Sequence, residues 1–160
     1  MGSSFVVLTM RRVGFCSGMT QSMRHERASS ETYCGLVKYF QTFSDLAGVC
    51  LEESWVLEVA PSDDTLALRV EAVLTPEHPL YEAPKPGELS CYRRAWLSIR
   101  SEDPIDVRLS GARPAVDATG ERDLGHVDGF APNPMGNGWE LEGDWGEAVV
   151  RGPEVTLLFD

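Results

Sequence analysis

Two runs of alternating apolar and polar residues, separated by a short polar cluster, constrain the fold of this chain most strongly. The runs cover residues 55–60 and 65–74, and the cluster between them is Pro61–Asp64. A period of two places successive side chains on opposite faces of a strand. The apolar residues expected to share a face are, in the first run, Trp55, Leu57 and Val59 and, in the second, Leu66, Leu68, Val70 and Leu74. Because proline and aspartate favour turns, the segment predicts a β-hairpin with one buried and one solvated face.

Shorter segments of the same kind follow along the chain. Alternation predicts strands over residues 91–100, 105–109, 139–141, 145–150 and 155–159, with a short strand around 115–118. Alternating strands favour antiparallel pairing, because parallel strands covered on both faces read as continuous apolar runs. We therefore expect a mostly β (α+β) domain, either an antiparallel β-sandwich or a partly open barrel. Two long loops are expected at 75–90, which is rich in proline, and at 111–138, which has little periodicity.

The chain before the hairpin has a different pattern. Apolar residues over 30–47 recur at helical spacing, and Gly48 is placed to end a helix, so we expect one short helix on the N-terminal side of the sheet. A strand over 36–43 is the alternative, because aromatic and β-branched residues are common there. Residues 1–28 are basic and lack periodicity, which predicts a poorly ordered arm ahead of a single domain over 29–160. An added edge strand over 5–13 is the alternative for the arm.

The charge of the chain excludes some partners. The net charge is −11, and residues 1–30 carry four arginines and one glutamate, which leaves −14 on residues 31–160. A body this acidic repels phosphate backbones, so we expect no binding to nucleic acid. No apolar run approaches the roughly 20 residues needed to span a bilayer, so we expect no membrane association and a cytoplasmic location. Acidity instead favours attraction to a basic protein partner.

Motifs for catalysis are weak. Gly14–Gly18 has the form glycine–x–nucleophile–x–glycine, but the sequence pattern predicts neither the buried strand before it nor the helix after it that such an elbow requires. The glycine-rich fingerprints of nucleotide-binding proteins are absent, and no two cysteines have the spacing of a zinc site. We therefore predict no catalytic residue and no cofactor, and we expect that the protein is not an enzyme.

Aromatic and acidic side chains provide candidate ligand-binding residues. Aromatic faces beside polar groups are the ingredients of sugar-binding surfaces and of protein-binding hot spots. The candidates lie on predicted strands or next to the two long loops, and they are Tyr81, Glu82, Trp96, Trp139 and Trp145. Packing in the core is the alternative for Trp139 and Trp145, because tryptophan is usually largely buried.

Histidines in the two long loops provide a candidate metal site. If the loops met at one end of the sheet, His78, His126 and Asp128 would supply mixed nitrogen and oxygen ligands, with Glu82 nearby. The alternative is that these are ordinary loop histidines, either exposed or bonded to backbone carbonyls.

The order of elements over about residues 36–100 resembles that of small uncharacterised bacterial β-rich domains, among them immunity-type proteins. The resemblance consists of a helix, an acidic hairpin, a loop with His78–Pro79 and Tyr81, and a strand with Cys91–Tyr92. It includes no catalytic signature, so no residue roles follow from it.

Our leading hypothesis is a non-enzymatic acidic binding module, of immunity or inhibitor type, for a basic protein partner. A small-ligand or carbohydrate-binding domain is the alternative, and a metal-dependent enzyme using the His78 and His126 loops ranks third. Self-association through exposed sheet edges is compatible with each of these, because an unpaired edge must be covered or paired.

Overall fold

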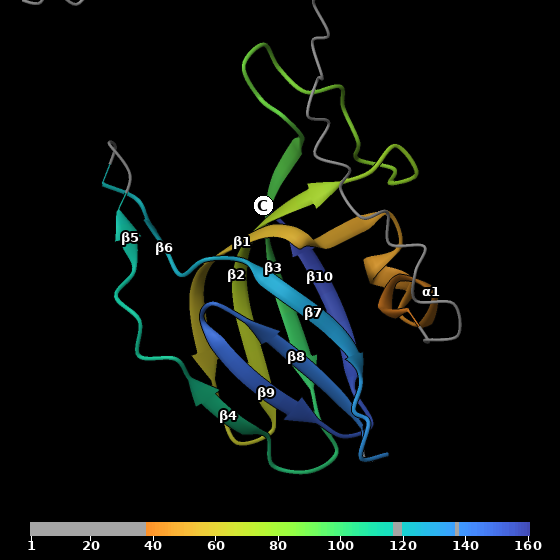
Figure 1. The fold of residues 1–160 in the computed structure, drawn as a ribbon. Coiled ribbons are helices and arrows are strands. Elements are labelled where there is room, and N and C mark those ends of the chain that lie inside the picture. The colour runs from red at the N-terminus through yellow and green to blue at the C-terminus, as the bar shows by residue number, and fades with distance from the viewer. Residues whose placement is uncertain (1–37, 117–119, 137) are drawn as a thin grey trace, which may run out of the picture. The chain divides into compact units, whose positions relative to one another are not determined.

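Two antiparallel sheets face each other across one apolar core (Figure 1). The computed structural model describes residues 38–116, 120–136 and 138–160, so the predicted arm at 1–28 and its alternative strand at 5–13 lie outside the described residues. Sheet A contains, in spatial order, β1 (Val49–Pro61), β2 (Thr65–Leu74), β3 (Cys91–Arg100) and β10 (Glu154–Phe159). Sheet B contains β4 (Asp106–Leu109), β9 (Gly146–Val150), β8 (Trp139–Gly143) and β7 (Val127–Pro132).

A small ribbon made of β5 (Ala115–Val116) and β6 (Arg122–Asp123) completes the strands of the described residues. The prediction of a mostly β fold with antiparallel sheets is confirmed, and the two sheets form a sandwich that is not closed into a barrel. Among the described residues, no helix has the length and apolar character that crossing a membrane requires.

The β1–β2 hairpin confirms the predicted buried face of its second strand. Leu66, Leu68 and Val70 are fully buried. The prediction that Trp55, Leu57 and Val59 share a face is wrong, because Leu57 is a bulge: Val56 lies opposite Val70, while Glu58 lies opposite Arg69. One extra residue in a strand moves every later side chain to the opposite face of the sheet. Trp55 therefore lies opposite Glu71 on the outer face, whereas Val59 lies opposite Leu68 and packs against the core.

A wider irregularity interrupts β1 between Cys50 and Trp55, and two hydroxyl groups replace the missing ladder bonds. The buried Ser54 hydroxyl donates to the Cys50 carbonyl (2.6 Å) and accepts from the Val73 N–H (3.0 Å). The Tyr39 hydroxyl accepts from the Leu51 N–H (2.9 Å) and donates to the Glu52 carboxylate (2.6 Å). Burial raises the pKa of Tyr39, and the neighbouring Glu52 raises it further, so the phenol remains a donor. Buried backbone groups rarely lack partners, and here side chains provide them.

Tyr39 belongs to the short helical segment that was expected before the hairpin. The segment consists of α1 (Tyr39–Thr42) and the 3₁₀ turn η2 (Ser44–Leu46), separated by Phe43 in an extended conformation. The prediction of one short helix is confirmed, although its first part at 30–37 lies outside the described residues. The described residues of the alternative strand, 38–43, contain no strand. Gly48 takes the left-handed conformation (φ +73°) and ends the segment as predicted.

The core lies between the inner faces of the two sheets. β3 confirms its predicted face, since Ala95, Leu97 and Ile99 are fully buried. The main core side chains are Leu51, Val56, Leu66, Leu68, Val70, Leu97, Ile99 and Leu157 from sheet A, and Val127, Phe130, Leu141, Ala148 and Val150 from sheet B. Each contribution follows from the alternation of its strand, with polar residues left on the two outer faces.

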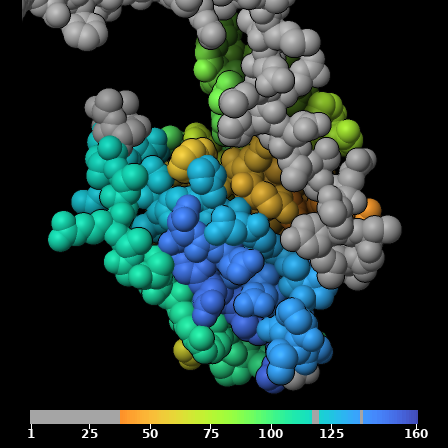
Figure 2. Space-filling view, in the orientation of Figure 1, coloured from red at the N-terminus to blue at the C-terminus, as the bar shows by residue number. Residues whose placement is uncertain are grey.

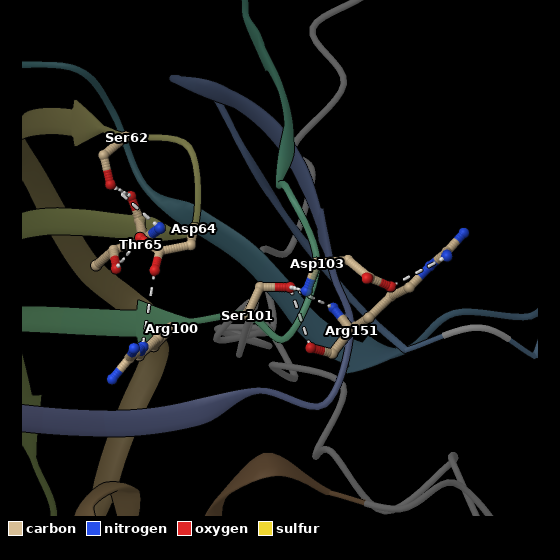
Figure 3. Close-up of polar contacts among 7 residues, drawn as sticks. All are labelled: Ser62, Asp64, Thr65, Arg100, Ser101, Asp103 and Arg151. Atoms are coloured by element: carbon tan, nitrogen blue, oxygen red, sulfur yellow. Dashed lines mark hydrogen bonds and ion pairs between the residues drawn. The ribbon is translucent and has the colours of Figure 1, made fainter.

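Two junctions hold the sheets together. At one edge the Val56 N–H donates to the Gly125 carbonyl (2.8 Å), the Leu124 N–H donates to the Val56 carbonyl (2.7 Å), and the rings of Trp55 and His126 lie 3.7 Å apart. At the other junction the Ser101 hydroxyl joins the end of β3 to the turn before β10 (Figure 3). It donates to the Arg151 carbonyl and accepts from the Arg151 N–H, each at 3.0 Å.

Candidate functional site

The outer face of sheet B gathers negative charge, and we call it the acidic face. Figure 2 looks onto this face, with β8 and β9 in blue at its centre. Five carboxylates lie on it together with Arg108, the only cation on the face among the described residues. The carboxylates are Asp106, Asp128, Glu140, Glu142 and Glu147. They gather because each strand alternates: the side chains next to the buried Leu141 and Ala148 in their strands take the outer face.

Repulsion within the acidic face is only partly compensated. Arg108 lies 3.1 Å from the Glu147 carboxylate and 3.4 Å from that of Asp106. Glu142 lies directly opposite Glu147 in the β8–β9 register, and like charges at such positions destabilise a sheet. Within the part of the chain that the structure describes, Glu140, Glu142 and Asp128 take part in no ion pair. The face therefore holds negative charge that the described protein does not neutralise.

A shallow groove of about 360 Å³ crosses the acidic face beside the β8–β9 turn. Its lining includes the carboxylates of Asp128, Glu142 and Glu147, the glycines at 143 and 146, and Leu109, which is 58% exposed. A Cβ atom at Gly146 would lie 2.2 Å from the Arg108 carbonyl oxygen, so the close approach of β9 to β4 requires glycine there. An exposed apolar side chain beside carboxylates suits a long cationic side chain, whose methylene groups and charge need both.

A second and larger hollow, of about 650 Å³, lies where the proline-rich loop 75–90 meets the end of sheet A. The structure brings two predicted ligand-binding residues, Tyr81 and Glu82, together in its lining. Tyr92 and Phe159 add two further rings, and the Arg93 guanidinium lies 2.7 Å from the Glu82 carboxylate.

Hydrogen bonds fix the loop that forms one wall of this hollow. The Thr75 N–H donates to the Gly48 carbonyl (2.9 Å), and the His78 N–H donates to the Thr75 carbonyl (2.9 Å). The Tyr81 N–H donates to the His78 carbonyl (3.0 Å). A Cβ atom at Gly48 would lie 2.7 Å from the His78 backbone nitrogen. The loop backbone therefore contacts the backbone of Gly48 so closely that no side chain fits between them.

The residues of the predicted metal site lie in three different surroundings. His78 packs its ring against Phe159 (5.2 Å between centroids), and burial lowers its pKa. The His126 ring lies on Trp55, and its Nδ1 is 3.9 Å from the Asp144 carboxylate. Asp128 lines the groove of the acidic face. Within the described ranges, no three histidine, cysteine or acidic side chains gather in a way that could hold a metal ion.

The three candidate tryptophans also lie in different parts of the fold. Trp145 is 3% exposed and lies in the core, which was the alternative for it. Trp139 packs at the edge of the core against Phe43 and Phe130, with ring centroids 4.8 and 5.0 Å away. Trp96 lies half-buried on the outer face of sheet A, where the Arg69 guanidinium stands 5.4 Å from its ring centroid.

The acidic face was missing from the sequence-based candidates. Its signal was present in the chain, because Glu140 and Glu142 flank Leu141 and a tight turn brings Glu147 opposite Glu142. Comparison with protein-family models, with curated proteins and with solved structures found no match for this chain.

Proposed function

We propose that this protein is a cytoplasmic, non-enzymatic binding module whose acidic face docks onto a basic protein. The observation that carries the proposal is the pair Glu142 and Glu147, opposite each other on neighbouring strands of a face that holds five carboxylates. A strand pair with opposite charges at these positions would be more stable. Such repulsion supports a binding role for this face, because binding sites often reduce the stability of the free protein.

Docking would take place in two steps. The clustered carboxylates of the acidic face attract a basic partner over long range and raise the association rate. Arginine or lysine side chains of the partner then enter the groove, where carboxylates accept their hydrogen bonds and Leu109 packs on their methylene groups. Because surface charges interact over only about 8 Å at physiological ionic strength, the first step weakens with salt.

Selection from a phage-displayed library of random peptides tests this proposal without a known partner. Peptides rich in arginine and lysine should be enriched on the natural protein and should bind poorly to an acidic-face variant. That variant carries Glu140→Gln, Glu142→Gln and Glu147→Gln. A matched control carries three glutamine substitutions at other exposed glutamates, Glu58→Gln, Glu102→Gln and Glu154→Gln.

The control separates a local site from overall charge, since both variants lose three negative charges. Enriched peptides should bind the control nearly as well as the natural protein. If the enriched peptides lack basic residues, or if the acidic-face variant binds them as well as the control does, the proposal fails.

A further inference from the structure

The hollow between the proline-rich loop and sheet A is separate from the acidic face, and its chemistry differs. We infer that it is a binding site for a neutral saccharide, with Tyr92, Tyr81 and the Arg93–Glu82 pair as its main contacts. The acidic face lies on the other sheet, so this inference does not depend on the proposed function.

The charges in the hollow are close to balance. The charged residues that line it are three cations and four carboxylates, namely Lys85, Arg93 and Arg94 with Glu71, Glu82, Glu88 and Asp160. Arg93 lies 2.7 Å from Glu82, and Arg94 lies 3.9 Å from Glu71. A phosphate would meet carboxylates beside every arginine, and a free cation would meet the guanidinium groups. A neutral ligand avoids both penalties.

Paired arginine and glutamate side chains place strong donors and strong acceptors next to each other. A sugar hydroxyl can accept from a guanidinium while it donates to a carboxylate, and neighbouring hydroxyls can repeat the pattern. The Arg93 side chain is 36% exposed and the Glu82 side chain is 70% exposed. The outer atoms of the pair therefore remain available to a ligand.

Aromatic side chains supply the apolar half of the site. Tyr92 extends from the outer face of β3 and Tyr81 from the loop, and Phe159 lies at the end of β10. A pyranose ring presents apolar C–H groups that pack against aromatic rings, which contribute apolar area together with defined geometry. A saccharide uses both halves of such a site, because its ring has apolar C–H faces and its hydroxyls donate and accept hydrogen bonds.

The site is largely formed before any ligand binds. The loop wall is tied to Gly48 through Thr75, and the Glu82 N–H donates to the Cys91 sulfur (3.4 Å). Farther along, the Glu88 N–H donates to the Lys85 carbonyl (2.9 Å) and the Lys85 N–H donates to the Glu88 carboxylate (3.2 Å). Fixed walls reduce the entropy that binding would otherwise lose.

Binding to immobilised neutral oligosaccharides of glucose, mannose, xylose and N-acetylglucosamine tests the inference, with sulfated oligosaccharides on the same surface. The natural protein should bind at least one neutral oligosaccharide, and Tyr92→Ala should weaken that binding about tenfold, the equivalent of 1.4 kcal/mol. Arg93→Ala should weaken it as well, whereas Leu109→Ala on the acidic face should leave it unchanged. Tyr92 is the better test residue than Tyr81, because Tyr81 packs against the core and its removal would disturb folding.

Backbone amide NMR shifts provide a second measurement on the natural protein. Addition of the bound oligosaccharide should move signals of residues 79–94 and 159–160 and leave those of β8 and β9 in place. The inference is overturned if no neutral oligosaccharide binds, if the sulfated ones bind more tightly, or if Tyr92→Ala binds like the natural protein.

Discussion

Replacement of Ser54 by alanine tests whether a single hydroxyl holds the irregular part of β1 together. The Ser54 hydroxyl is fully buried and joins the Cys50 carbonyl to the Val73 N–H, at a position where the strand ladder is interrupted. Alanine keeps the backbone and removes only the oxygen. The Val73 N–H then stays buried without its partner, and an unsatisfied buried donor costs about 1–3 kcal/mol. We expect Ser54→Ala to lower the free energy of unfolding by that amount.

Urea denaturation followed by tryptophan fluorescence measures this loss, and Ser98→Ala is the matched control. Ser98 lies half-buried on the outer face of β3, in the same sheet, and no hydrogen bond of its hydroxyl is present within the described residues. Its replacement should change the free energy of unfolding by less than about 0.5 kcal/mol. The midpoint should fall for Ser54→Ala with an unchanged m-value. If the two variants have the same stability, water or backbone movement satisfies Val73 and the reasoning is refuted.

Each of the remaining predictions rests on one contact. Gly48→Ala should lower the free energy of unfolding by about 1–3 kcal/mol, because φ is +73° and the new Cβ atom would meet His78; equal urea midpoints would contradict this. The Cys50 thiol should react with iodoacetamide about a hundredfold more slowly than a free cysteine at pH 8, as followed by peptide mapping, because burial and then Glu52 raise its pKa from 9.0 to about 11. The same shift means that stability should fall as the pH rises through the range between these two values, since the unfolded chain releases the proton first. Glu142→Lys should raise the free energy of unfolding by about 0.2–1 kcal/mol in low salt, because it places a cation opposite Glu147; no rise would show that the repulsion is already screened.

The sequence predicts strands well where one face alternates without interruption. β2 and β3 bury Leu66, Leu68, Leu97 and Ile99 as expected, because no bulge shifts their period of two. The sequence did not predict β7, because the alternation of its residues is interrupted. A register shift between Val127 and Gly129 spaces its buried residues, Val127 and Phe130, three apart, which breaks the alternation that identifies a strand.

Bulges also explain the error in β1. Nothing in the residues 55–59 distinguishes a regular strand from one with an extra residue at Leu57, because the bulge depends on the partner strand and on the edge contact with residues 124–126. Tertiary pairing therefore decides which of two adjacent apolar residues is buried, and local pattern alone does not.

Candidate sites depend on which loops meet, and the sequence does not contain that information directly. Tyr81 and Glu82 are neighbours in the chain and so remain together in the hollow. His78 and His126 lie in different loops, and the structure places one against Phe159 and the other against Trp55. Tyr92 and Phe159 join the hollow only because β3 begins and β10 ends beside the same loop.

The salt dependence of association tests the central claim, that the acidic face attracts a basic partner, most directly. Association rate constants of an arginine-rich peptide enriched by selection would be measured by stopped-flow fluorescence at increasing sodium chloride for the natural protein, the acidic-face variant and the control variant. We predict a steep fall with salt for the natural protein and the control, and a much shallower fall, from a lower starting rate, for the acidic-face variant. Equal slopes for the two variants would contradict the claim, because the attraction would then come from the overall charge and not from the carboxylates of sheet B.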